Sequence, residues 1–179
     1  KAFNGLVVID EAYIDFTEES SWTQWLNAYP NLIVTQTLSK AYGLAGIRLG
    51  ICYASKEIIA VLNKIKPPYN INSLTQEAAI KALQNKDVLT DQIDSILKER
   101  NRLNNAFETY PFIKKIYPSE ANFILIKVDD ANKRYDELIN KGIVVRNRSS
   151  QLHCDDCLRI TVGTPSENTQ LLTLLKTLK

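Results

Sequence analysis

Methionine is absent from this 179-residue sequence, and histidine occurs only once. A chain without methionine contains no encoded start, so we expect that further residues precede it in the whole protein. The three cysteines are too few, and odd in number, for the disulfide framework of a small secreted protein. Their use fits a reducing compartment. The three cysteines and the single histidine also offer too few well-spaced ligands for a structural zinc site, so we expect no bound metal.

Long apolar runs and a strong charge of one sign are also missing. No window approaches the roughly 18 continuous apolar residues of a membrane-spanning helix, and residues 1–20 lack the pattern of a signal peptide. The net charge is only +2, with basic and acidic residues intermixed. Nothing in this distribution indicates a nucleic-acid or membrane partner. We therefore expect a cytoplasmic protein that acts on small molecules.

Short apolar runs alternate with helical patterns over residues 1–86. Helical patterns occupy 20–30 and 55–66, and strand candidates lie at 6–9, 32–34 and 47–54. Continuous apolar runs of this kind are typical of strands that are covered on both faces in a parallel sheet. The segment therefore predicts part of an α/β domain with a parallel-dominated sheet.

The pattern changes over residues 87–179. An apolar stripe from Leu89 to Phe107 predicts one long helix, and Gly142 is placed to end a later helix. Thr164 and Glu167 form a capping-box pattern at the start of the last helix. Strands are predicted at 122–128, 143–148 and 157–163. This order predicts a small α+β domain.

Polar residues follow each predicted strand of the first segment: Asp10 and Tyr13, then Ser39 and Lys40, then Arg48. Open parallel sheets bind ligands at the carboxyl ends of their strands. Taken alone, each of these residues is more often a turn, cap or solvated residue. Together they supply an amine for a Schiff base, a carboxylate for a pyridine nitrogen, and hydroxyls and an arginine for a phosphate.

Several motifs carry a resemblance to a known family. The runs "DEAYIDF", "TLSKAYGLAGIRLG", "PPYNIN", "VVRNR" and "CLRITVGT" resemble the pyridoxal-phosphate aminotransferases of the aspartate aminotransferase fold, in particular the histidinol-phosphate aminotransferases. The resemblance covers essentially the whole chain. It implies the fold of type I pyridoxal-phosphate transferases. Residues 1–86 would be the C-terminal portion of the large, cofactor-binding domain, and residues 87–179 the small C-terminal α+β domain.

The resemblance also assigns a role to each residue of the predicted cofactor site. Asp10 would pair with the pyridine nitrogen of pyridoxal 5'-phosphate, and Tyr13 would hydrogen-bond the 3-oxygen of the ring. Lys40 would form the Schiff base and then move the proton between the substrate and the cofactor. The cofactor phosphate would be held by Ser39, Arg48 and Thr37.

The resemblance implies that arginines bind the substrates. A guanidinium suits this task, since it binds a carboxylate or a phosphate in the same bidentate manner. Arg159 matches the arginine that receives the carboxylate of glutamate or 2-oxoglutarate. Arg146 matches one that holds the phosphate of histidinol phosphate, although the spacing does not decide between Arg146 and Arg148. Tyr69 and Asn70 follow two prolines in a rigid turn and are candidates to line the substrate cleft.

The implied reaction is a transamination between histidinol phosphate and 2-oxoglutarate in histidine biosynthesis. Family members are homodimers of about twice this length, so this chain would hold only part of the pocket and is expected to be inactive alone. Two alternatives stay open: a threonine-phosphate decarboxylase, and a ligand-sensing transcription regulator that carries the same domain.

The sequence "HCDDC", from His153 to Cys157, contains two of the three cysteines. It has neither the four ligands of a zinc site nor the helix start of a thioredoxin-like motif, and it leads directly into a predicted strand. We interpret these residues as a loop.

Overall fold

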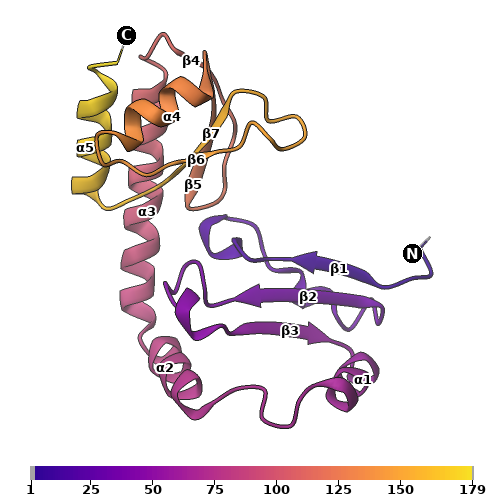
Figure 1. Cartoon of the computed structure of the whole chain (residues 1–179). Helices are drawn as coiled ribbons and strands as arrows, with labels where there is room; N and C mark the ends of the chain where they lie inside the picture. Colours follow the sequence, from indigo (N-terminus) through magenta and orange to yellow (C-terminus); the bar gives the residue numbers. More distant parts are fainter. Residues whose placement is uncertain (1–2, 179) are drawn as a thin grey trace. The chain divides into compact units, whose positions relative to one another are not determined.

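A computed structural model describes residues 3–178 of the chain (Figure 1). The chain divides into two compact units, Lys1–Asp91 and Gln92–Lys179. The dividing point falls inside the long helix α3, Lys86–Phe107, whose first residue is close to the predicted domain boundary. Within the described residues, no helix combines the length and apolar character needed to cross a membrane.

The N-terminal unit contains a three-stranded sheet in the order β1-β2-β3. Strand β1, Val7–Asp10, runs parallel to β2, Leu32–Thr37, whereas β3, Gly50–Ala54, is antiparallel to β2. The described sheet is therefore mixed, with β3 as the antiparallel strand beside the parallel pair β1 and β2. The chain between β2 and β3 makes a loop with one short helical turn, and such a connection returns the chain in the opposite direction.

Short helices connect and flank these strands. Three of them are single 3₁₀ turns: η1 Ile14–Phe16, η2 Trp22–Trp25 and η3 Ala45–Ile47. The turn η2 stands where the sequence predicts a longer helix over 20–30. The α-helices of the N-terminal half are α1, Lys56–Ile65, and α2, Ser73–Gln84. Because η3 occupies 45–47, the strand predicted over 47–54 begins only at Gly50.

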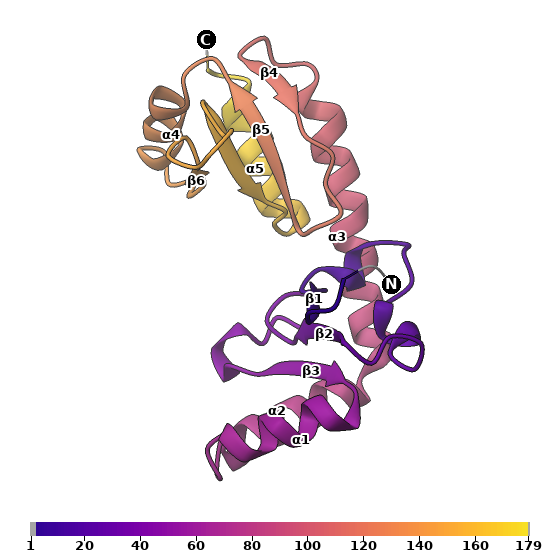
Figure 2. The ribbon, with the colours of Figure 1, turned by 90° about the vertical axis from the view of Figure 1, so that its right-hand side faces the viewer.

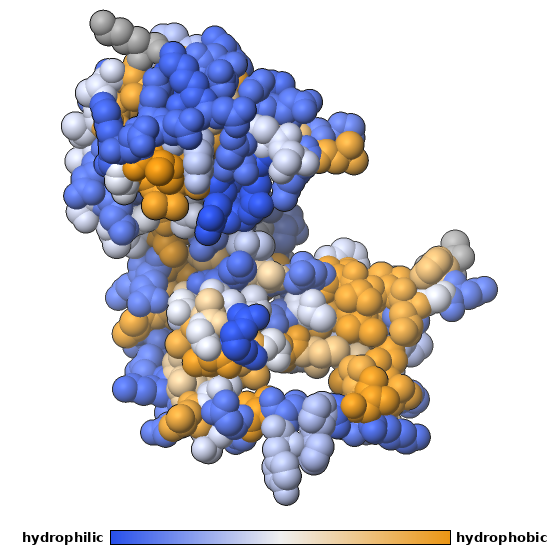
Figure 3. Space-filling view, viewed as in Figure 1, coloured by the Kyte–Doolittle hydropathy of each residue, from blue (hydrophilic) through white to orange (hydrophobic). Residues whose placement is uncertain are grey.

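Apolar side chains of the N-terminal unit are extensively exposed (Figure 3). Val8 of β1 is 60% exposed, and no residue of α1 is buried. The expectation that the strands are covered on both faces is therefore wrong for β1 in the described chain. An apolar run shows that a strand can be buried, but it does not identify which segment covers it.

The C-terminal unit is an antiparallel sheet in the order β4-β5-β7-β6, with helices packed on one face (Figure 2). Its strands are β4 Ile113–Ile116, β5 Phe123–Val128, β6 Arg146–Asn147 and β7 Cys157–Thr161. Alternate residues of β5 and β7 enter a core shared with α3, with α4, Ala131–Ile139, and with α5, Pro165–Leu175. The sequence did not predict β4, and β6 is shorter than the predicted strand over 143–148.

Both helix signals predicted in the C-terminal unit are confirmed. Gly142 has φ +81° just beyond α4, and the Ile143 N–H donates to the Leu138 carbonyl. Thr164 and Glu167 form the reciprocal capping box of α5. A left-handed glycine and a capping box satisfy backbone groups that a helix leaves unpaired at its ends.

A buried arginine in α4 makes the shortest ion pairs among the described residues of the unit. Arg134 is 2% exposed, and its guanidinium donates to both carboxylate oxygens of Asp129, at 2.9 and 2.7 Å. A further bond of 2.9 Å reaches Glu137, and the Phe112 ring lies 4.5 Å from the guanidinium carbon. The hydrogen bonds from Arg134 lower the pKa of Asp129 to about 2.

This pKa shift predicts an acid-sensitive contribution to stability. The folded-state pKa of Asp129 is lower than the ordinary aspartate value of 3.8, so folding gains stability above pH 3.8 and loses it as the pH falls toward 2. In urea titrations, the stability difference between the wild type and Asp129→Asn should therefore shrink over that window. The control is Asp136→Asn, which removes an exposed carboxylate of α4, the helix that carries Arg134. An unchanged difference would contradict the prediction.

Candidate functional site

Strand register gathers the predicted cofactor residues at one edge of the N-terminal sheet. Asp10, the last residue of β1, pairs with Thr35, and Thr37 ends β2 opposite Gly50, the first residue of β3. Arg48 lies two residues before the start of β3 and therefore belongs to the same edge. The antiparallel direction of β3 does not disturb this, because the start of β3 lies beside the end of β2.

Adjacent acidic residues at the end of β1 have different environments. Asp10 is exposed, and its carboxylate accepts a hydrogen bond from the Ala12 N–H at 3.1 Å. Glu11 is buried, and its carboxylate accepts from the Trp22 N–H, the Ser21 hydroxyl and the Gln36 amide. Glu11 thus fixes η2 to the sheet and leaves Asp10 accessible to a ligand.

Lys40 lies in a loop that is anchored on both sides. Leu38 and Ala41 are buried, and they flank Ser39 and Lys40, which are partly exposed. The Gly43 N–H donates to the Lys40 carbonyl at 3.0 Å, and Gly43 has φ +66°, a conformation that glycine adopts without a steric penalty. The loop therefore holds the lysine at a fixed position.

The lysine amine contacts a second predicted site residue. The Nζ atom of Lys40 lies 5.2 Å from the centre of the Tyr13 ring, within the range of a cation–π interaction. Tyr13 in turn packs near the buried Phe16, with ring centres 6.5 Å apart. The structure therefore brings Lys40 and Tyr13 together, although they are far apart in the sequence.

Two nearby side chains have shifted pKa values. Burial raises the pKa of Asp15, which belongs to η1. Burial also raises the pKa of Tyr42, and the negative charges of Asp15 and Tyr53 add to that rise. Neutral Tyr42, two residues after Lys40, is therefore favoured over its phenolate.

The predicted phosphate ligands differ in how freely they could bind an anion. The Thr37 hydroxyl donates to the Leu49 carbonyl at 3.4 Å and accepts from the Ser39 N–H at 3.1 Å. Arg48 is exposed and has φ +55°, a left-handed conformation that is strained for a non-glycine residue. Thr37 thus shapes the loop around Ser39, and Arg48 is held in an unusual backbone geometry at the sheet edge.

This set of donors fits pyridoxal phosphate. An exposed carboxylate, an amine, a phenol, hydroxyls and an arginine lie along one edge, and the ligand offers a ring nitrogen, an aldehyde, a ring oxygen and a phosphate. Among the described residues, no cluster of three or more histidine, cysteine or acidic side chains could bind a metal.

The predicted substrate arginines are neighbours in the C-terminal sheet. Arg146 of β6 is the direct cross-strand partner of Arg159 of β7. Arg148 continues the pairing, since its N–H donates to the Cys157 carbonyl at 2.8 Å. Side chains two residues apart in a strand share a face, so all three arginines belong to the face opposite the helices. Like charges directly opposite each other repel, and an anion between them removes this cost.

An aromatic residue that sequence reasoning missed supports Arg159. The Phe123 ring lies 5.2 Å from the guanidinium carbon of Arg159. Phe123 pairs with Thr161, which places it diagonally across from Arg159 on the same face. Strand alternation could have put Phe123 on this face, but only the register of β5 against β7 identifies the contact.

The remaining predicted residues have little surrounding structure. Tyr69 is 94% exposed, and Asn70 is exposed in the same loop between α1 and α2. The next residues are ordered by Asn72, which caps α2 by accepting from the Thr75 N–H at 2.9 Å. A role for Tyr69 and Asn70 in substrate binding stays a prediction.

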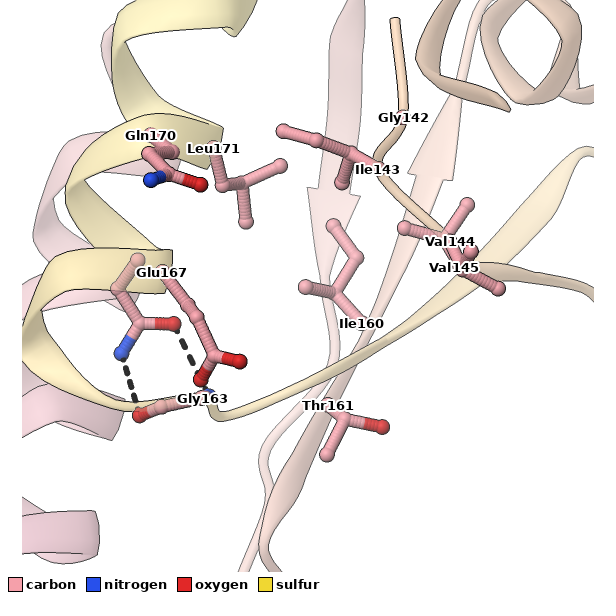
Figure 4. Close-up of a pocket in the computed structure, with 11 residues that line it drawn as sticks. Gly142, Ile143, Val144, Val145, Ile160, Thr161, Gly163, Glu167, Gln170 and Leu171 are labelled. Atoms are coloured by element: carbon pink, nitrogen blue, oxygen red, sulfur yellow. Dashed lines mark hydrogen bonds between the residues drawn. The ribbon is translucent and has the colours of Figure 1, made fainter. Parts of the chain in front are cut away.

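A pocket of about 410 Å³ lies elsewhere in the C-terminal unit, between α5 and the segment 142–145 (Figure 4). Its described lining includes none of the predicted site residues. Apolar side chains such as Ile143, Ile160 and Leu171 line it together with the polar Glu167 and Asn168. One Glu167 carboxylate oxygen is engaged by Thr164 in the capping box, and the Asn168 side chain bonds the backbone of Gly163 and the Glu99 carboxylate. These two polar side chains are thus already committed to hydrogen bonds within the fold.

Comparison with known proteins decides the family. The family model for aminotransferase class I and II matches residues 1–175. The chain belongs to this aminotransferase family. A curated histidinol-phosphate aminotransferase of Flavobacterium psychrophilum is 61% identical over 178 residues, which cover 99% of this chain and 51% of that protein. The aminotransferase chain thus spans about half the length of the curated relatives it matches.

Solved structures confirm the fold class of this aminotransferase chain. A crystal structure of the histidinol-phosphate aminotransferase from Clostridium acetobutylicum matches with a TM-score of 0.89 at 30% identity, over 96% of this chain and 53% of that one. The enzyme from Sinorhizobium meliloti, solved with pyridoxal-5'-phosphate, matches with a TM-score of 0.85 at 26% identity, over 97% and 50%. The fold is that of the C-terminal part of these enzymes.

Proposed function

We propose that the whole protein transfers an amino group between histidinol phosphate and 2-oxoglutarate, with pyridoxal 5'-phosphate as cofactor. The observation that carries this proposal is the placement of Asp10, Tyr13, Lys40 and Arg48 at one sheet edge. Relatives with 61% and 60% identity bear the name histidinol-phosphate aminotransferase, which supports the substrate assignment. We also infer a cytoplasmic homodimer, with no nucleic-acid or membrane partner.

Each residue at the edge has a defined task in this proposal. Bound pyridoxal phosphate supplies an aldehyde and a pyridine ring that accepts electrons. Asp10 holds a proton on the ring nitrogen, and Tyr13 donates a hydrogen bond to the ring 3-oxygen. Lys40 moves the proton at the substrate α-carbon. Ser39 and Arg48 bind the phosphate, and Thr37 fixes the backbone of Ser39.

The C-terminal sheet would supply the substrate contacts. Arg159 binds the α-carboxylate of glutamate, and Arg146 binds the second anionic group, which is a phosphate or a carboxylate. A planar guanidinium suits both groups because both present two oxygens in a matching geometry. Arg148 is the alternative to Arg146, and Tyr69 and Asn70 are further candidates for substrate contact.

The test is an assay of the full-length protein with histidinol phosphate and 2-oxoglutarate. We expect glutamate to form at a rate that depends on added pyridoxal phosphate, and the 179-residue chain alone to be inactive. Carbon dioxide release from threonine phosphate without a 2-oxoglutarate requirement would replace the proposal with a decarboxylase. A DNA-binding helix-turn-helix upstream of this chain, without turnover, would favour a regulator.

Arg159→Leu in the full-length protein should separate the two substrates. Loss of a charge-assisted, bidentate contact costs about 1.5–3 kcal/mol, so the KM for glutamate should rise by about 10- to 100-fold. The KM for histidinol phosphate, which has no carboxylate, should rise much less. Steady-state kinetics in both directions measure this difference. Equal losses for both substrates would show that Arg159 acts on the fold and not on the carboxylate.

A further inference from the structure

Two consecutive tight turns precede β7 and contain both cysteines of the "HCDDC" run. The Cys154 N–H donates to the Gln151 carbonyl at 3.1 Å, and the Cys157 N–H donates to the Cys154 carbonyl at 3.0 Å. The third residue of each turn has a positive φ, 60° at His153 and 55° at Asp156. The pair of cysteines thus occupies the first and last positions of one hydrogen-bonded turn.

The second turn is fixed to the rest of the C-terminal unit. The Asp156 carbonyl accepts from the Val128 N–H of β5 at 2.8 Å, and the Asp156 carboxylate accepts from the Ala131 N–H at the start of α4 at 3.3 Å. The Cys157 carbonyl accepts from Arg148 beside β6. These bonds hold the turn in one conformation, so the cysteines keep their separation without further ordering.

The geometry of the turn suits a covalent bond between the two sulfur atoms. The ends of a β-turn lie within about 7 Å between Cα atoms, and disulfides join cysteines whose Cα atoms are about 4.4–6.8 Å apart. The Cys157 thiol donates to the Asp155 carbonyl at 3.5 Å, so the sulfur points back over its own turn. Both cysteines are free thiols; Cys154 is partly exposed and Cys157 is buried.

We propose that Cys154 and Cys157 are a redox-active dithiol that small-molecule disulfides convert to an intramolecular disulfide. This proposal does not depend on the aminotransferase reaction. Closure would covalently lock the turn that connects β6 to β7, the two strands that carry Arg146 and Arg159.

The reaction balances as two thiol–disulfide exchanges. The thiolate of Cys154 attacks one sulfur of the oxidant, the oxidant S–S bond breaks, and one small thiol leaves. The Cys157 sulfur then loses its proton and attacks the Cys154 sulfur, and the second small thiol leaves with that proton. Two protein thiols are oxidised and one disulfide is reduced. Cys154 reacts first because it is partly exposed, whereas Cys157 is buried and burial raises the pKa of its thiol.

Oxidised glutathione is the probe, and the sequence provides a convenient readout. Trypsin releases Ser149–Arg159, which contains both cysteines of the turn and excludes Cys52. The 179-residue chain is incubated with oxidised glutathione, alkylated with N-ethylmaleimide and digested, and the mass of this peptide is measured. We expect a peptide that carries no alkyl group and has a mass two hydrogens lower than that of the dithiol form. A peptide that keeps glutathione on Cys154 and an alkylated Cys157 would overturn the proposal, as would a doubly alkylated peptide.

Three controls test the fixed geometry. Cys52→Ser should leave the result unchanged, and Cys157→Ser should stop the reaction at the mixed disulfide on Cys154. The third control compares the folded and the guanidinium-unfolded chain at the same ratio of oxidised to reduced glutathione. Unfolding should lower the ratio of disulfide to dithiol by at least about tenfold, because the turn no longer holds the two sulfurs together. An equal or larger ratio in the unfolded chain would show that the native turn does not favour the bond.

Discussion

Lys40→Ala in the full-length protein should lower the rate of transamination by about 10²- to 10⁴-fold, the range for loss of a positioned acid–base group. In the proposed reaction Lys40 supplies the amine that moves the proton at the substrate α-carbon, and alanine has no such group. Substrate KM values should change much less than kcat, because the arginines of the C-terminal sheet are untouched. Initial rates of glutamate formation measure the effect.

A matched control is available in the same unit. Lys56→Ala removes an exposed lysine at the start of α1 and should leave the rate unchanged. Borohydride reduction adds a second readout: in the wild type it should fix the cofactor to the peptide that contains Lys40, and in Lys40→Ala this attachment should be lost. A rate for Lys40→Ala close to that of the wild type would mean that the assignment of the nucleophile is wrong.

The sequence could predict that the candidate cofactor residues share one sheet edge, because strand ends are a local signal. Asp10 and Lys40 each follow an apolar run, and parallel strands bring their carboxyl ends to the same edge whatever else the sheet contains. The direction of β3 was not predictable in the same way. Its apolar run is compatible with either direction, and the answer depends on how the loop before Gly50 turns.

The contacts around Arg159 depend on register, which the sequence does not contain. The motif "CLRIT" predicts a strand, but the pairing of Arg159 with Arg146 requires knowing which residues of β6 and β7 lie opposite each other. The same holds for Phe123, whose contact with Arg159 crosses from β5 to β7. Short β4 was missed because Ile113 and Ile116 are separated by two lysines, which weakens its apolar pattern.

Arg134 illustrates a residue whose importance only the folded structure reveals. In the sequence it lies in a polar helix between Lys133 and Tyr135, a setting that predicts a solvated surface charge. In the structure its side chain is buried, and it contacts two carboxylates and the Phe112 ring. The apolar neighbours of α4 exclude water from the guanidinium, so its charge must be compensated by protein groups.

Arg134→Met should lower the free energy of unfolding of the chain by about 3 kcal/mol, the lower end of the range for removing one partner of a buried ion pair. The lower end applies because Asp129 and Glu137 are partly exposed and can recover some hydration. Urea unfolding followed by circular dichroism measures the change. Lys133→Met, on the exposed side of the same helix, should change stability by less than about 0.5 kcal/mol, because its contact with Glu137 is long, at 4.0 Å, and solvated. Similar losses in the two variants would show that α4 tolerates neither substitution and that the buried ion pairs are not the cause.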